Sequence, residues 1–510
     1  MTTKAHMIFF FGTMASWIII VLTIAFTVLI NSILRKKRES TKQVPPPGPK
    51  GLPILGSLHL LGDLPHQDLY KLSQKYGPIM QIRLGLVPTI VVSSPEAAQL
   101  FLKTHDLVFA SRPCTQATKY MNYRRKGIVF TEYGSYWRNI RKLCSLELLT
   151  NSKIETYRHM RKEEVGNLIE VLKGAADARK AVCLSEMVEK VVEDMMFRMI
   201  FGFKDGRFRF KPIITEMLEL VGAFNVGDYV PFLAPFDVQR LVPRMKAASK
   251  KYDEFLEKII EEHIEDGKEQ HGKARDFIHL MLSLMESDST KGVKFGKDNI
   301  KAIILDVLGA GLDTSANAVN WAFPELLRHP KVMKKVQEEL RDIVGMDRMV
   351  EETDLPKLNY LNMVIKESMR LHPVAPLLVP HESIEETTIN GYFIPKKSRV
   401  LVNVWTIGRD PNVWSEDAEK FNPDRFIDVD VDIHGRDFQL IPFGSGRRIC
   451  PGMNLGLLVV QLVLAQLLHC FTWELPDGVN PRDLDMTEKF ALTMSRASNL
   501  HCIPSYRLSL

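Results

Sequence analysis

The chain has few cysteines, and their spacing marks neither a disulfide framework nor a zinc site. Six cysteines are scattered over 510 residues, and no two of them form a Cys-x-x-Cys pair. Disulfide-built domains and structural zinc sites both require regular cysteine spacing. We therefore expect the bulk of the chain to lie in a reducing compartment.

Other absences narrow the class of protein further. The net charge is +6, but no basic tract is long enough to predict a nucleic-acid partner. No glycine-rich nucleotide-binding motif is present, so this chain is not expected to bind NADPH itself. There is no internal repeat and no low-complexity segment. What remains is an ordinary globular composition, 45% hydrophobic and 25% charged, that is sufficient for a large core.

The N-terminus carries a long apolar run. Residues 7–34 contain no charged residue, whereas a bilayer needs roughly 20 apolar residues in a helix. A cleavable signal peptide has a shorter apolar core. The basic run Arg35-Lys36-Lys37-Arg38 follows, against a single Lys4 before it, and places the rest of the chain on the cytosolic face. We predict a retained membrane anchor, and a buried core helix is the weaker alternative.

Proline marks the boundary between this segment and the globular part. Five of the residues from 45 to 53 are proline, which disfavours helix and stiffens the backbone. The predicted organisation is an anchor over residues 1–34, a basic and proline-rich linker over 35–56, and one catalytic domain over 57–510.

The periodicity of the globular part predicts a mainly α fold with small β-sheets. Short strands are expected at 80–83, 89–92, 387–393 and 399–402. Long amphipathic helices are expected at 137–146, 154–172, 184–200, 212–223, 237–265, 299–328, 330–344, 359–371 and 453–470. Pro324 is expected to kink or end the helix over 299–328 near residue 320.

The most informative segment is Phe443-Gly444-Ser445-Gly446-Arg447-Arg448-Ile449-Cys450-Pro451-Gly452. Glycine allows a sharp turn and a close approach of the backbone to a flat ligand. A cysteine at a helix N-terminus has its thiolate favoured by the helix dipole, and axial ligation of a haem requires such a thiolate. Taken alone, a cysteine in a glycine-rich turn is more often a small buried hydrophobe.

Three further motifs bear on this choice. Glu367 and Arg370 lie three residues apart on a predicted helix, where they can pair. Ala310-Gly311-Leu312-Asp313-Thr314-Ser315 places weak helix formers in the middle of the 299–328 helix, which favours either a local opening or a close helix crossing. Trp137-Arg138-Asn139-Ile140-Arg141 is the third, and taken alone it equally fits a surface cation–π pair.

Together these motifs resemble the cytochrome P450 family of haem-thiolate monooxygenases, and in particular its plant microsomal members. The loop matches the family pattern F-x-x-G-x-R-x-C-x-G without gaps, and Glu367 and Arg370 match its E-x-x-R pair. The resemblance covers nearly the whole chain. It implies the cytochrome P450 fold after an N-terminal transmembrane helix, haem b as cofactor, and a location at the endoplasmic reticulum membrane with the catalytic domain in the cytosol.

The resemblance also implies a role for each matched residue. Cys450 would ligate the iron, and Asp313 and Thr314 would relay protons to iron-bound dioxygen. Glu367, Arg370 and Arg425 would form a buried structural triad on the cysteine side. The remaining cofactor-binding residues, as propionate contacts, close-approach glycines or a shield for the sulfur, would be Trp137, Arg141, His381, Phe443, Gly446, Arg448 and Gly452.

The implied reaction is hydroxylation of a small hydrophobic substrate, aromatic or terpenoid, with O2 and electrons from NADPH through cytochrome P450 reductase. Arg138, Lys142 and Arg447 would attract that acidic partner, or would form a solvated face. The expected substrate pocket is lined by Tyr120, Ala310, Val374, Leu378 and Phe490. Two alternatives stay open, a reductase-independent haem-thiolate isomerase or dehydratase and a non-catalytic haem-binding membrane protein.

Overall fold

The computed structural model describes Thr23, Ile24, Thr27 and residues 44–204, 210–269, 276–286, 295–476 and 478–509. The predicted membrane anchor falls almost wholly outside these residues. Two compact units are present, one of residues 1–46 with 387–394, and one of residues 47–386 with 395–510. In the first unit, β5 (Thr387–Ile389) and β6 (Tyr392–Ile394) form an antiparallel hairpin. Everything that follows concerns the second unit.

One four-stranded sheet lies in the second unit, in the order β1-β2-β7-β4. β1 (Ile79–Leu84) and β2 (Val87–Val92) form an antiparallel hairpin, β2 runs parallel to β7 (Arg399–Val402), and β7 pairs with β4 (His381–Glu382). Most side chains of β2 and all of β7 are buried, as their continuous apolar runs predict. The proline-rich segment packs here, because the Pro47 carbonyl accepts the N–H of Gln81 at 2.8 Å. The second half of the predicted linker is therefore part of the catalytic body.

Two smaller sheets are built from the C-terminal part of the chain and one short strand near residue 182. β3 (Val182–Cys183), β11 (His501–Tyr506) and β8 (Phe471–Glu474) form one, and β9 (Glu488–Phe490) and β10 (Met494–Arg496) form the other.

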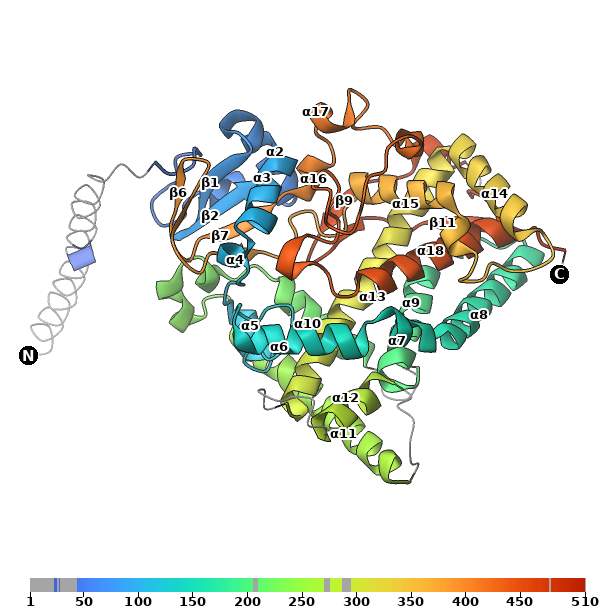
Figure 1. Cartoon of the computed structure of the whole chain (residues 1–510), viewed down its shortest axis with the longest axis horizontal. Helices are drawn as coiled ribbons and strands as arrows, with labels where there is room; N and C mark the ends of the chain where they lie inside the picture. Colours follow the sequence, from blue (N-terminus) through green and yellow to red (C-terminus); the bar gives the residue numbers. More distant parts are fainter. Residues whose placement is uncertain are drawn as a thin grey trace, which may run out of the picture. The chain divides into compact units, whose positions relative to one another are not determined.

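Helices make up most of the remainder, which confirms the predicted fold class (Figure 1). The helices are α2 (Pro65–Tyr76), α3 (Pro95–Gln99), α4 (Asp106–Phe109), α5 (Gln116–Met121), α6 (Ser135–Leu143), α7 (Asn151–Thr156), α8 (Arg158–Asp177), α9 (Leu184–Phe201), α10 (Lys211–Gly222), α11 (Leu241–Glu269), α12 (Phe277–Glu286), α13 (Lys297–Arg328), α14 (Pro330–Val344), α15 (Asn359–Leu371), α16 (Val404–Ile407), α17 (Pro411–Trp414) and α18 (Met453–Cys470).

The helix α13 organises the core, packing against α9, α18 and α15 (Figure 1). Both α13 and α18 are long and apolar enough to cross a membrane by length and composition. Their most apolar windows are 67% and 72% buried inside the protein, so both serve as core helices.

Pro324 was expected to kink α13 or to end it near residue 320, and the second of these alternatives is wrong. The helix continues through Pro324 to Arg328 and stops only before Pro330. Pro324 is buried along with the residues on both sides of it, so tertiary packing outweighs the intrinsic cost of proline in a helix. The sequence Ala310–Ser315 is likewise helical throughout.

One carboxylate joins three segments that are far apart in the sequence. Glu488 in β9 accepts hydrogen bonds from His66 at 2.8 Å, Gln67 at 2.7 Å and Trp405 at 2.9 Å. These donors belong to α2 and α16. Burial raises the pKa of Glu488, but the hydrogen bonds outweigh it and hold the pKa at about 2.

We expect Glu488→Gln to lower the free energy of unfolding at pH 7 by about 1–3 kcal/mol, because an amide N–H2 then faces buried donors. A carboxylate with a depressed pKa stabilises the fold above its ordinary value of 4.5 and loses this effect as the pH falls toward 2. The difference between wild type and variant in urea unfolding should therefore shrink below pH 4.5, and a constant difference would contradict the assignment.

Candidate functional site

The Cys450 loop is a tight turn that ends at the N-terminus of α18. The N–H of Cys450 donates to the Phe443 carbonyl at 2.9 Å, which closes the loop. Gly444 and Gly446 have positive φ angles of 72° and 67°, which favour glycine. A Cβ at Gly446 would lie 2.1 Å from the Leu102 carbonyl oxygen. The close approach at Gly446 is therefore to protein backbone, whereas the predicted approach was to a flat ligand. A Cβ at Gly452 would meet no atom within 4 Å.

The Cys450 thiol is partly buried beside positive charge. Burial raises its pKa, while the N–H of Gly452 and the charge of Arg141 lower it. Arg141, in α6, donates to the Ile449 carbonyl at 2.5 Å, so a cation lies directly next to the cysteine. This environment favours a thiolate as soon as a cation binds the sulfur.

Three guanidinium groups gather behind the loop, and their hydrogen bonds go to backbone carbonyls. Arg448 donates to Ala110 at 2.6 Å, Arg112 donates to Pro380 at 3.0 Å, and Arg141 donates to Ile449. Burial, together with repulsion from neighbouring arginines, lowers the pKa of Arg448 to about 8 and that of Arg112 to about 9. The Nε of Arg112 is buried without a hydrogen-bond partner. Buried, mutually repelling cations of this kind are suited to an anionic ligand.

Arg112, Arg141 and Arg448 form a cationic cluster, and His381 and Trp137 lie beside it. The His381 Nδ1 donates to the Phe109 carbonyl at 2.8 Å, and burial beside Arg112 lowers the pKa of His381 well below 6.5. His381 is therefore neutral at pH 7. The Trp137 ring stacks under Arg448 at 4.0 Å, and its Nε1 donates to the Ile128 carbonyl at 2.9 Å. The residues predicted for the propionates are thus brought together, and Arg112 joins them.

Asp306, on α13, holds the adjacent segment in place. Its Oδ2 accepts the N–H groups of Ile128 at 2.6 Å and Val129 at 3.0 Å, and its Oδ1 accepts Asn122 at 3.0 Å. A Cβ at Gly127 would lie 2.0 Å from Oδ2, so this contact requires glycine. Burial raises the pKa of Asp306 to about 6, although these hydrogen bonds lower it. Sequence reasoning missed Asp306, because a single acid in an apolar helix carries no spacing signal.

Glu367, Arg370 and Arg425 form one buried network. The Glu367–Arg370 pair is fully buried, with an Nε–Oε2 distance of 2.8 Å, and Arg425 Nε lies 3.0 Å from Glu367 Oε1. Arg370 also donates to the carbonyls of Gly408, Ala418 and Lys420. The network ties α15 to the irregular segment that precedes the Cys450 loop.

Asp313 and Thr314 face different surroundings on α13. The Thr314 hydroxyl donates to the Ala310 carbonyl at 2.6 Å. Asp313 lines a cavity of about 390 Å³ between α9, α10, α13 and the 490–493 segment, together with Glu189 and Lys211. Burial raises the pKa of Asp313, and the charge of Lys211 opposes the rise. Burial also raises the pKa of Glu189, and the nearby Asp313 charge adds to the effect.

The five predicted pocket residues come from several elements of the chain. Phe490 lines the 390 Å³ cavity. The Leu378 Cδ1 lies 3.8 Å from the Cβ position of Gly444, and the Val374 carbonyl accepts the N–H of Met494. Tyr120 lies under Lys246 of α11 at 5.1 Å and does not line that cavity, so it forms part of a helix contact there. Ala310 lies on α13 one turn before Thr314.

Comparison with known proteins identifies the class. A model of the cytochrome P450 family matches residues 46–502. Cytochrome P450 CYP736A12 of Panax ginseng is 56% identical over 468 residues, which cover 91% of this chain and 93% of that protein. Flavonoid 3'-monooxygenase of Petunia hybrida is 41% identical over 506 residues, which cover 96% and 98% of the two chains. A zebrafish cytochrome P450 solved with abiraterone matches with a TM-score of 0.72 and 26% identity, covering 87% of this chain and 100% of that one.

The chain therefore belongs to the cytochrome P450 family, and its similarity to plant members confirms the predicted plant type. It is a monooxygenase-class oxidoreductase that carries haem b on a cysteine thiolate. The residues present fit that cofactor, because one loop offers a cysteine and the cationic cluster offers buried positive charge for two carboxylates.

We expect Glu367→Gln to destabilise the protein by roughly 3–5 kcal/mol, because the buried Arg370 loses its counter-charge and Arg425 keeps only that of Asp417. The loss should appear as a smaller reduced carbon-monoxide absorption band per milligram of protein. Glu338→Gln, which breaks a solvent-exposed pair with Lys334, is the matched control and should change stability by less than about 1 kcal/mol. Equal effects of the two substitutions would refute the structural role.

Proposed function

We propose that this chain hydroxylates a small hydrophobic substrate, aromatic or terpenoid, with O2 and electrons that NADPH supplies through cytochrome P450 reductase. The observation that carries the proposal is that one fold holds both the cysteine loop with its cationic cluster and, on α13, an acid, Asp313, next to an alcohol, Thr314. The bound haem supplies dioxygen activation. The protein supplies the ligand, the counter-charges and a proton route.

Cys450 provides the iron ligand in this proposal, and Arg112, Arg141 and Arg448 hold the propionates with Trp137 and His381 beside them. Since His381 has its Nδ1 committed to Phe109, only its Nε2 is free to accept or donate. Carboxylates near these cations would relieve their mutual repulsion. The protein should therefore retain haem through charge as well as through the sulfur.

Asp313 and Thr314 provide the proton route. Asp313 reaches a cavity that also contains Glu189 and Lys211, so its carboxyl can exchange protons with water there. Its raised pKa increases the fraction that is protonated near neutral pH. Thr314, the next residue on the same helix, would pass a proton toward the haem side.

The proposed substrate class rests on the apolar residues of the segment that follows α15. This segment contacts both the Cys450 loop and β10. Val374 and Leu378 lie on this segment, and Phe490 lies on the adjacent β9. Apolar walls with few polar groups favour a small hydrophobic ligand. The Petunia relative is a flavonoid 3'-monooxygenase, and that supports an aromatic substrate here.

The electron donor and the membrane location belong to the same proposal. Arg138 and Lys142 are exposed on α6, the helix that carries Arg141, whereas Arg447 pairs with Asp106 at 2.7 Å. Exposed cations beside the cysteine side would attract an acidic reductase surface. The apolar N-terminal run would anchor the protein in the endoplasmic reticulum membrane with this face in the cytosol.

Reconstitution with the reductase tests the proposal. Full-length protein in vesicles, given NADPH, reductase and a panel of flavonoids and terpenoids, should form hydroxylated products that retain one atom of 18O2. Cys450→Ala should lose the reduced carbon-monoxide band and all turnover, whereas Cys114→Ala, at an exposed thiol, should keep both. Product formation without NADPH and reductase would favour an isomerase or dehydratase, and haem binding without any product would favour a non-catalytic role.

Thr314→Val should separate electron use from product formation. Without the hydroxyl, proton delivery is impaired, so NADPH oxidation should continue while O2 is released as hydrogen peroxide and the product formed per NADPH falls several-fold. Thr314→Ser keeps the hydroxyl and should restore most of the coupling. Normal coupling in the valine variant would remove Thr314 from the proton route.

A further inference from the structure

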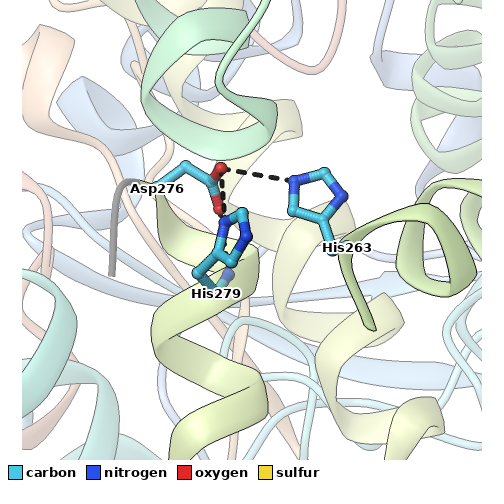
Figure 2. Close-up of side chains that lie close together, drawn as sticks. All are labelled: His263, Asp276 and His279. Carbon is cyan, nitrogen blue, oxygen red and sulfur yellow. Dashed lines mark hydrogen bonds and ion pairs between the residues drawn. The ribbon is translucent and has the colours of Figure 1, made fainter. Parts of the chain in front are cut away.

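A histidine–carboxylate–histidine cluster lies outside the residues assigned to the haem site. His263 comes from α11, Asp276 directly precedes α12, and His279 lies in the first turn of α12. Figure 2 shows both imidazole rings turned toward one carboxylate. The three ligand atoms lie within 4.8 Å of one another. The side chains of Asp276 and His263 are 3% and 8% exposed, and that of His279 is 22% exposed.

The hydrogen bonds of His263 fix its tautomer. Its Nδ1 lies 2.7 Å from the Ile259 carbonyl oxygen, which can only accept, so Nδ1 carries a proton. In the neutral ring the lone pair is then on Nε2, and Nε2 points at Asp276 Oδ2 from 3.3 Å. Two acceptors that face each other in a buried place require a cation between them.

Both histidines address the same carboxylate oxygen. His279 Nδ1 lies 2.8 Å from Asp276 Oδ2. The other carboxylate oxygen, Oδ1, accepts the backbone N–H of His279 at 2.9 Å and so caps α12. One oxygen of Asp276 therefore holds the helix, and the other is directed at two ring nitrogens.

Two kinds of cation would satisfy this arrangement, a proton or a metal ion. A charge-assisted N–H···O bond is normally about 2.7–2.9 Å long, shorter than the 3.3 Å found for His263. Ligands of a tetrahedral zinc ion with bonds of about 2.0–2.1 Å are separated by about 3.3 Å. The spacing at His263 is that of two ligands sharing an ion, whereas the 2.8 Å between His279 Nδ1 and Asp276 Oδ2 is that of a hydrogen bond, so metal binding would have to lengthen this second distance.

The backbone of Gly202 lies close to the carboxylate. Gly202, at the end of α9, has φ of 78°, and a Cβ there would lie 2.9 Å from Asp276 Oδ2. Any other residue at this position would crowd that oxygen. A histidine ligand that donates its other N–H to a backbone carbonyl, as His263 does to Ile259, is the usual support of a metal-binding imidazole.

We propose that His263 Nε2, Asp276 Oδ2 and His279 Nδ1 bind a divalent transition-metal ion of the zinc type, with water as fourth ligand. Two imidazoles and one carboxylate form a donor set that suits Zn²⁺. The ion joins the C-terminal part of α11 to the start of α12. The site is structural, because it stabilises the contact between these two helices.

Metal analysis of the full-length haem protein without a histidine tag tests the proposal. After chelation, addition of Zn²⁺ and gel filtration, wild type should retain one more equivalent of zinc per protein than His279→Gln. Zn²⁺ should also raise the unfolding temperature of wild type. Asp276→Asn keeps an oxygen for the helix cap but loses the charge, and should also lose the equivalent. His159→Gln, at a histidine that is 86% exposed, is the matched control and should behave as wild type.

The reduced carbon-monoxide band of each variant reports whether the haem domain is folded, so a loss of zinc is separable from a loss of structure. Wild type without the additional equivalent would overturn the proposal. Equal zinc retention and equal thermal stabilisation in wild type, His279→Gln and Asp276→Asn would overturn it too, since binding would then occur elsewhere. Because the readout is metal content, the result is independent of the substrate and of turnover.

Discussion

Buried positive charge on both sides of the Cys450 loop is the constraint on which the site depends. On one side Arg370 and Arg425 share the carboxylate of Glu367, and that network is complete within the protein. On the other side Arg112 and Arg448 have only backbone carbonyls as acceptors, and burial depresses their pKa values. The first group holds the loop in place. The second is completed only when an anionic cofactor binds.

The helix α13 connects this site to the rest of the core. Its middle carries Asp313 and Thr314. The preceding part carries Asp306, whose carboxylate accepts the N–H groups of Ile128 and Val129. Its C-terminal part is buried around Pro324. Since Arg448 and Trp137 both donate to the Ile128 carbonyl, the same peptide unit is held from two sides. The proposed proton route and the cationic cluster are therefore positioned by one continuous helix.

Much of the fold follows from local pattern. The helices at 330–344, 359–371 and 453–470 have the predicted bounds, because apolar periodicity marks their extent and a proline or glycine stands at one end or at both. Pro324 misled for a physical reason, since packing on all sides outweighs the local cost of proline. The charged triad was accessible to sequence reasoning because its residues belong to recurring motifs. Arg112 and Asp306 were not, because each is a single residue whose partner is backbone from a distant segment.

The sequence by itself determined the family, and it predicted the cysteine ligand and the acid–alcohol pair, because these are encoded in short motifs with fixed spacing. Only the tertiary structure decided which cations surround Cys450, that His381 is neutral, and that Tyr120 belongs to a helix contact. It also brought His263, Asp276 and His279 together across two helices. Burial and the direction of a lone pair depend on neighbours from remote parts of the chain, and no local pattern carries that information.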